Sequence, residues 1–189
     1  MHTLLTIDRK GSLVPGQSIT LTQPDYTKLL QADITLTPSI ADAGFPDGLS
    51  RHGQRYLLNW SMKPRYKLHE DQEDRYLIYA TPAIEAIFEL VRAYEFPGLT
   101  SRFQSFFGSP TMVDLRKFAG QYVQSGTIYE VQAQKYSLFD MALVAPGYTI
   151  GHTLANARQY WSGSHSPDPI LECLIDLPVT VGNEVGRYP

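Results

Sequence analysis

The chain has 189 residues, the length of one domain, and 43% of them are hydrophobic and 19% charged, which favours a buried core over disorder. A formal net charge of -3 argues against a surface that is basic throughout, although it leaves room for a local basic groove. One cysteine excludes an internal disulfide, no apolar run reaches the roughly 18 residues of a membrane span, and Asp8 comes too early for a secretory signal. We therefore expect a single domain over residues 1–189, cytoplasmic and without membrane contact.

The N-terminal elements are short and separated by turn residues. The apolar run at 4–7 and the alternating residues 19–22 predict two strands, joined by a loop through Val14-Pro15-Gly16. Residues 24–50 follow, with a predicted short helix around 26–31 and a loop rich in Pro, Gly and Asp.

Residues 48–68 contain no acidic side chain. Cations and aromatic residues alternate there instead: Arg51, Arg55, Tyr56, Trp60, Lys63, Arg65, Tyr66 and Lys67. Such a segment can hold phosphates and stack bases, which would suit RNA or another nucleotide. The alternative is a solvated loop whose aromatic residues fold back on the core.

The second half mixes helices and strands. Thr81 and Pro82 suit the N-cap and first position of a helix that ends before 96–98. Further helices are predicted from 109–110 and over 153–160, and strands over 127–133, 170–175 and 179–181. Because the order has no regular βαβ rhythm, the predicted class is α+β.

Familiar catalytic motifs are absent from the sequence. It has no P-loop, dinucleotide-binding glycine motif, nucleophile elbow or zinc-protease motif, and its five histidines lack metal-ligand spacing, so we expect no metal. A Cys173 nucleophile with His152 or His165 as its base is an alternative, but a lone cysteine in an apolar strand is usually a packed small residue.

Glu172 is the most informative residue, because it interrupts the apolar strand at 170–175. The two-residue period places it on one face with Ile170 and Leu174. A carboxylate among such neighbours must be paired or lie at the wall of a cleft. The alternative is a strand face that is simply exposed.

Residues 101–107 alternate as a strand would, with two hydroxyls and two aromatic rings on one face: Ser101, Phe103, Ser105 and Phe107. Hydroxyls can orient a neighbouring carboxylate, and phenylalanine rings can stack on a flat heteroaromatic ring. A core strand with incidental serines is the alternative.

Short segments spread in order along nearly the whole chain add a resemblance. They are residues 4–9 with 13–16, then 48–53, 88–92, 96–97, 101–107, 160–163 and 170–174. Together they resemble an uncharacterised bacterial domain family grouped with the ADP-ribosyltransferase fold. The resemblance implies a split β-sandwich with flanking helices that grips NAD+ between two small sheets.

The resemblance also implies roles for particular residues. Glu172 would be the catalytic glutamate beside the nicotinamide ribose, and Ser101 the central serine that orients it. The residue of the first motif would be Arg9 or Arg51. The residues expected to bind NAD+ are Arg9, Arg51, His52, Gly53, Arg102, Phe103, Phe107 and Tyr160.

The implied activity is transfer of ADP-ribose from NAD+ to a macromolecule, by a bacterial or phage toxin, effector or defence component. Arginine-modifying relatives carry a second acidic residue two positions before the glutamate, where this chain has Ile170, so we expect a nucleic acid or a non-arginine side chain as acceptor. An NAD+ glycohydrolase on the same fold and a non-catalytic nucleotide- or RNA-binding domain are the alternatives. A toxin of this class would also need an antitoxin or immunity protein.

Overall fold

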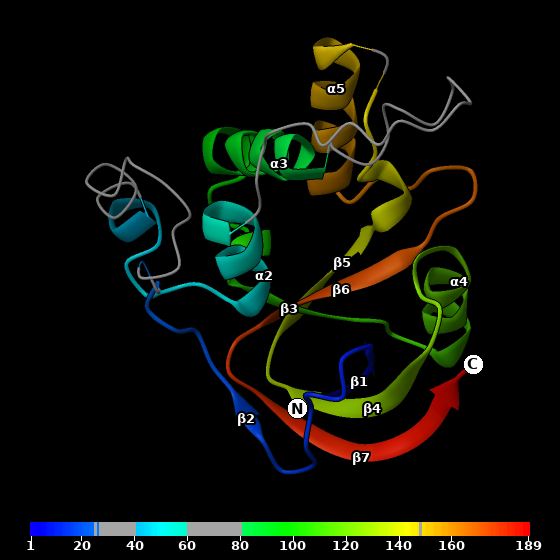
Figure 1. The fold of residues 1–189 in the computed structure, drawn as a ribbon. Helices are drawn as coiled ribbons and strands as arrows, with labels where there is room; N and C mark the ends of the chain where they lie inside the picture. Colours follow the sequence, from blue (N-terminus) through cyan, green and yellow to red (C-terminus); the bar gives the residue numbers. More distant parts are fainter. Residues whose placement is uncertain (25, 27–40, 60–80, 148) are drawn as a thin grey trace, which may run out of the picture.

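The computed structural model describes residues 1–24, 26, 41–59, 81–147 and 149–189, and in these ranges two antiparallel sheets form the centre of an α+β fold (Figure 1). The large sheet has the order β1-β4-β7-β2, and the small sheet has the order β3-β6-β5. The strands are β1 (His2–Asp8), β2 (Ser18–Ile19), β3 (Ser105–Gly108), β4 (Gly126–Ala133), β5 (Tyr136–Asp140), β6 (Leu171–Asp176) and β7 (Val179–Tyr188).

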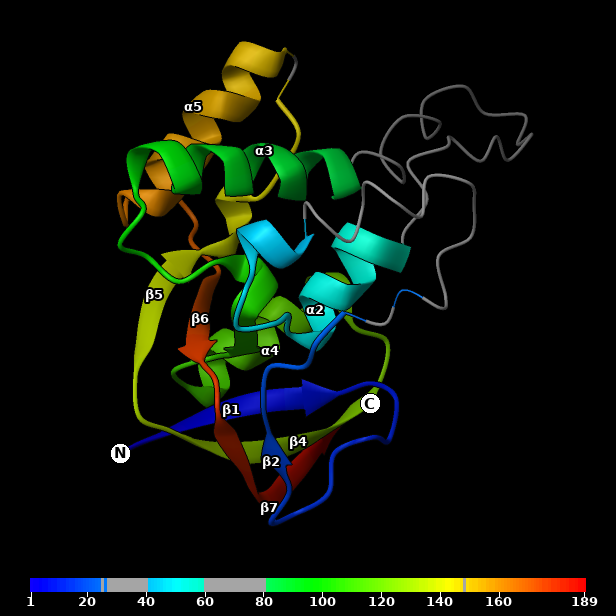
Figure 2. The same cartoon turned by 90° about the vertical axis from the view of Figure 1, so that its left-hand side faces the viewer.

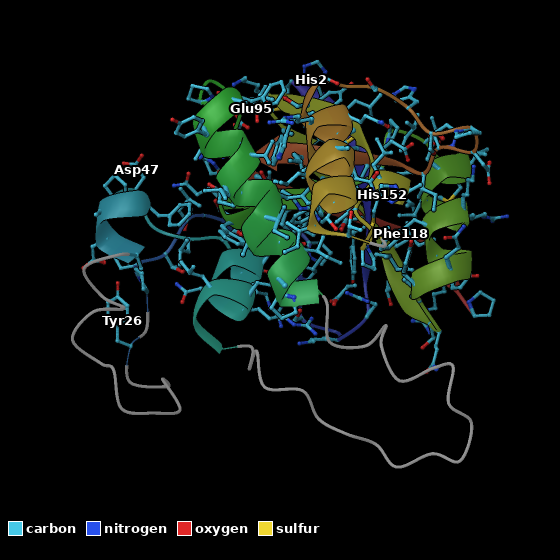
Figure 3. The ribbon with its side chains drawn as sticks, turned by 90° about the horizontal axis from the view of Figure 1, so that it is seen from above. His2, Tyr26, Asp47, Glu95, Phe118 and His152 are labelled. Atoms are coloured by element: carbon cyan, nitrogen blue, oxygen red, sulfur yellow. The ribbon has the colours of Figure 1, made fainter. Side chains whose placement is uncertain are left out.

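Helices flank the sheets. They are α2 (Arg51–Gly53), which continues as a π-helical turn Gln54–Asn59, α3 (Thr81–Glu95), α4 (Met112–Tyr122) and α5 (Ile150–Trp161). Figure 2 shows α3 and α5 on the side of the small sheet that faces away from the large sheet. Figure 3 looks down on this layer, with Glu95 at the end of α3 and Phe118 on α4 at the side of the molecule.

Two chain corners connect the sheets. Strand β4 is followed by β5 after two residues, and β6 is followed by β7 after two residues, so each pair passes from one sheet to the other. The sheets also meet where Leu5 of β1 exchanges two backbone hydrogen bonds with Ser109, of 3.0 and 2.7 Å. These links hold β1 close to the end of β3, which places both strands beside the cleft described below.

Both faces of β6 are covered, and the two-residue period sorts its side chains as predicted. Leu174 joins the apolar cluster beneath α3 and α5, whereas Cys173 and Ile175 join the cluster against the large sheet. Glu172 shares the helix-facing side with Leu174 and is 6% exposed. The alternative of an exposed strand face is therefore wrong.

Most predicted elements are confirmed, and their ends follow local chemistry. The side chains of Thr111 and Thr149 accept the hydrogen bonds that begin α4 and α5. Strand β7 runs past 181 to Tyr188, and β5 was not predicted. The helix predicted around 26–31 and the basic residues beyond Trp60 lie outside the described residues. In the described part of the chain, no helix has the length and hydrophobicity to span a bilayer.

The predicted strand at 101–107 is wrong over its first half. Residues Arg102–Gln104 form a 3-10 turn, and only Ser105–Gly108 are extended. The Ser101 side chain accepts from the Phe103 N–H at 3.0 Å, and the Ser105 hydroxyl donates to the Ser101 carbonyl at 2.8 Å. Serine hydroxyls that bond to nearby backbone groups compete with strand pairing, which explains the turn.

Candidate functional site

The candidate site is built around Arg102, a cation that is 3% exposed. Its Nη1 donates to Oε1 of Glu172 at 2.5 Å, and its Nε donates to Oε2 of Glu85 at 3.0 Å. The 3-10 turn after Ser101 supplies the arginine, β6 supplies Glu172 and α3 supplies Glu85. Three elements that are distant in sequence therefore meet at one guanidinium.

Aromatic rings and a phenol complete the surroundings of this cation. The Arg102 Cζ lies 5.0 Å from the ring centroid of Phe107 and 5.4 Å from that of Tyr160, both within cation–π range. The Tyr160 hydroxyl donates to Oε1 of Glu172 at 2.8 Å. Burial and the neighbouring Glu172 raise the pKa of Tyr160 well above its usual value, and this effect outweighs the opposite effect of Arg102. The phenol therefore keeps its proton and donates it in the hydrogen bond to Glu172.

Glu172 is held by only one of its two oxygens. Oε1 accepts from Arg102 and Tyr160, whereas Oε2 accepts no hydrogen bond from the residues that the structure describes. One guanidinium serves two carboxylates in this cluster, and in the described part of the chain Oε2 of Glu172 faces no cation of its own. The site can therefore stabilise a positive charge placed near Oε2.

Glu85 is ionised despite its burial. Burial alone would raise its pKa, but Arg102 and His52 lower it to about 2. Nε2 of His52 lies 3.2 Å from Oε1 of Glu85, an ion-pair distance without the alignment of a hydrogen bond. The helix α3 thus directs a second carboxylate toward the same site.

A cleft opens over this cluster, and among the described residues it has two adjoining parts. The inner pocket, of about 510 Å³, is lined by Glu85, Arg102 and Glu172, with Phe118 and Tyr122 from α4 on its wall. The outer pocket, of about 690 Å³, extends along the loop that follows β1. Both parts are lined by Thr6, Ile7, Arg9, His52, Arg55 and Phe107.

The outer pocket is rich in cations. Its wall includes Arg9, Lys10, Arg51 and Arg55. Among the described residues of that wall, Asp8 is the one carboxylate. It accepts hydrogen bonds from the backbone N–H groups of residues 10, 12 and 13, which help to lower its pKa against the effect of burial. The outer part of the cleft is therefore cationic, whereas the inner part sets two carboxylates, Glu85 and Glu172, among its arginines.

The structure brings several of the predicted site residues together. Glu172 and Arg102 line the inner pocket, Arg51 lines the outer pocket, and Arg9, His52 and Phe107 line both. Arg51 also donates from Nη1 to the Ser12 hydroxyl at 2.7 Å.

Four other predicted residues lie outside both pockets. Ser101 is buried and donates to Glu89 at 2.7 Å, so the expectation that it orients Glu172 is wrong. Phe103 packs edge-on against Phe45, with ring centroids 5.8 Å apart. Gly53 is needed for packing, because a side chain there would begin 2.2 Å from the Phe103 carbonyl oxygen.

Tyr160 is the fourth of these residues. Its ring is 0% exposed and stacks on Phe139, with centroids 4.7 Å apart, so it is not available to a ligand.

The residue that the sequence analysis missed is Glu85. In the sequence, Glu85 lies in the first turns of the predicted helix, where an acidic residue is favourable in any case, and no local pattern indicates its pairing with Arg102.

Cys173 does not have the surroundings of a nucleophile. Burial, with a contribution from Glu172, raises the pKa of the Cys173 thiol to about 12, so Cys173 is a packed residue rather than a nucleophile. In the described ranges, no group of three His, Cys, Asp or Glu side chains is close enough to hold a metal ion.

The similarity to a known protein family extends over almost the whole chain. A family model described as a protein of unknown function (DUF2441) matches residues 6–186. No curated protein matches the sequence.

Proposed function

The chain belongs to the DUF2441 family, and we propose that it is an NAD+-dependent ADP-ribosyltransferase. The observation that carries this proposal is the position of Glu172, whose buried carboxylate has one oxygen held by Arg102 and Tyr160 and the other left free at the inner pocket. The proposal includes the assignment of this α+β fold to the ADP-ribosyltransferase fold. It is supported by the small and large sheets and by the cleft beside β1, β3 and β6.

The residues that line the cleft suit the two charged parts of NAD+. The outer cations, with Arg9 at the junction of the pockets, can neutralise the pyrophosphate. The cationic nicotinamide ring suits the inner pocket, where Phe107 offers a ring face and Oε2 of Glu172 accepts no hydrogen bond from the described residues. Each pocket has the volume of an ordinary small-molecule site.

Cleavage of the bond between nicotinamide and ribose develops positive charge on the sugar, as in glycoside hydrolysis. Oε2 of Glu172 would stabilise this charge and accept a hydrogen bond from the ribose 2′-hydroxyl. Nicotinamide leaves as a neutral molecule, so the leaving group needs no strong acid. Arg102 holds Glu172 in place, and it does not have to move during the reaction.

The proposed acceptor is a nucleic acid or a side chain other than arginine. The position two residues before Glu172 is the buried Ile170, which is 2% exposed and offers no second acid. The role of a toxin, effector or defence component with a neutralising partner belongs to the same proposal, and it rests on the resemblance alone.

Replacing Glu172 by Gln tests the proposal. Wild-type protein incubated with labelled NAD+ and separate protein, RNA and DNA pools should release nicotinamide and label one pool. Glu172→Gln should lower both signals about a hundredfold or more, because the carboxylate that stabilises the transition state is lost. The matched control is Glu184→Gln on the exposed part of β7, which should behave as wild type.

Labelling that persists in Glu172→Gln would contradict the proposal. Nicotinamide release with no labelled pool would select the NAD+ glycohydrolase. Calorimetric binding of NAD+ or RNA without turnover would select the non-catalytic binding domain.

A further inference from the structure

His52 lies where the inner and outer pockets meet, and the cleavage step proposed above does not use it. Its ring is placed between Tyr56 and Phe107, with centroids 4.5 and 4.6 Å away. The side chain is 19% exposed, so it is fixed by packing and still reaches the cleft.

The two nitrogens of this ring have different surroundings. Nε2 is buried and lies 3.2 Å from Oε1 of Glu85. Nδ1 has no hydrogen-bond partner among the described residues. A carboxylate that faces one nitrogen keeps the proton there and leaves the other nitrogen as a base. Imperfect alignment of such a pair is common before a substrate is bound.

We propose that His52, oriented by Glu85, is the general base that activates the acceptor, an inference that rests on the proposed transferase function. The bond from ribose C1′ to nicotinamide breaks, and its electron pair leaves on the nicotinamide nitrogen. The acceptor oxygen or nitrogen forms the new bond to C1′, and its proton passes to Nδ1 of His52. The anionic Glu85 stabilises the imidazolium until the proton is released to water.

This role limits the class of acceptor. A base beside C1′ is useful for a neutral nucleophile, such as a hydroxyl or an uncharged N–H group, whose proton must be removed. An acceptor that is already anionic, such as a carboxylate side chain, gains nothing from it. The structure therefore assigns a neutral, protic acceptor to this cleft, in agreement with the absence of a second acid at Ile170.

Competition between simple nucleophiles tests this inference. The full-length chain is incubated with NAD+ in buffer containing methanol and sodium azide, and the ADP-ribose, methyl ADP-ribose and ADP-ribosyl azide that form are quantified by chromatography. Water and methanol need a base, whereas azide does not. His52→Gln should therefore raise the ratio of azide product to the other two products about a hundredfold. Glu85→Gln should raise it in the same direction, and the exposed His165→Gln should leave it unchanged.

The ratio is measured within one mixture and reports only on folded, NAD+-cleaving molecules, so partial unfolding of a variant does not disturb it. An unchanged ratio in His52→Gln would overturn the inference, as would loss of the azide product together with the others, because His52 would then be needed for cleavage or binding. If the wild type forms none of the three products, the proposed function itself fails.

Discussion

At the scale of single residues, the site depends on how one guanidinium is shared. Arginine offers five N–H donors in a planar fork, which allows Arg102 to bond Glu85 through one edge and Glu172 through another. Removing either partner of a buried pair leaves an uncompensated charge, whereas the complete cluster satisfies its members. This arrangement holds Oε1 of Glu172 in place and leaves Oε2 without a hydrogen bond from the described residues.

Tyr160 allows the positioning of Glu172 to be tested with little change in packing. Tyr160→Phe removes the hydroxyl that bonds Oε1 and keeps the stacked ring. We expect the free energy of unfolding in urea to fall by about 1–2 kcal/mol. The kcat for nicotinamide release should fall roughly tenfold, because Glu172 is held less precisely. Tyr94→Phe, at a position 88% exposed on α3, is the control. Equal kcat in Tyr160→Phe and wild type would show that the phenol does not position Glu172.

At the scale of elements, α3 has a structural and a chemical role. One side of the helix carries Glu85 to the site, and the same buried face packs Phe88 against α5. Trp161 of α5 donates from Nε1 to the Phe88 carbonyl at 2.8 Å. The position of Glu85 therefore depends on the packing of α3 against α5 and the small sheet.

Truncation of Phe88 measures this packing. Phe88 is 0% exposed, so Phe88→Ala removes a buried ring and should cost about 3–5 kcal/mol of unfolding free energy in a denaturant titration. Leu90→Ala on the opposite face of the same helix, where the side chain is 63% exposed, should change stability by less than about 0.5 kcal/mol. Similar losses in both variants would contradict the packing of α3 described above.

At the scale of the whole molecule, the cleft gathers cations along its outer wall, next to the two carboxylates of the inner pocket. The chain has a net charge of -3, yet the loop after β1 and the start of α2 gather Arg9, Lys10 and Arg51 on one wall. This local concentration is what a phosphate-bearing ligand requires, and the average composition does not reveal it.

Comparison of two arginines tests which one would hold the pyrophosphate of NAD+ in the proposed reaction, a question that the sequence left open. Arg9 lines both pockets and donates to the Tyr122 carbonyl at 3.5 Å, whereas Arg51 lines only the outer pocket and donates to the Ser12 hydroxyl at the shorter distance of 2.7 Å. Arg9→Gln should raise the KM for NAD+ at least about tenfold, through loss of a charge-assisted hydrogen bond. Arg51→Gln should raise the KM less, and the exposed Arg187→Gln should not change it. A larger effect in Arg51→Gln would reverse the assignment.

The sequence by itself determined the elements whose signals are local. Thr81 and Pro82 begin a helix, Phe96 and Pro97 end it, and the period of β6 puts Glu172 on the side of Leu174. Such features depend on neighbours a few residues away, so they can be predicted from the chain alone. The turn at Ser101 was missed because a side-chain hydrogen bond overrides the strand pattern.

Only the tertiary structure decided the composition of the site. Arg102 meets Glu85 across 17 residues and Glu172 across 70, and the approach of His52 to Glu85 requires α2 and α3 to pack together. Which buried charges pair depends on which surfaces the fold brings into contact. No local pattern carries that information, because an ion pair is selected by distance in space and by exclusion of water.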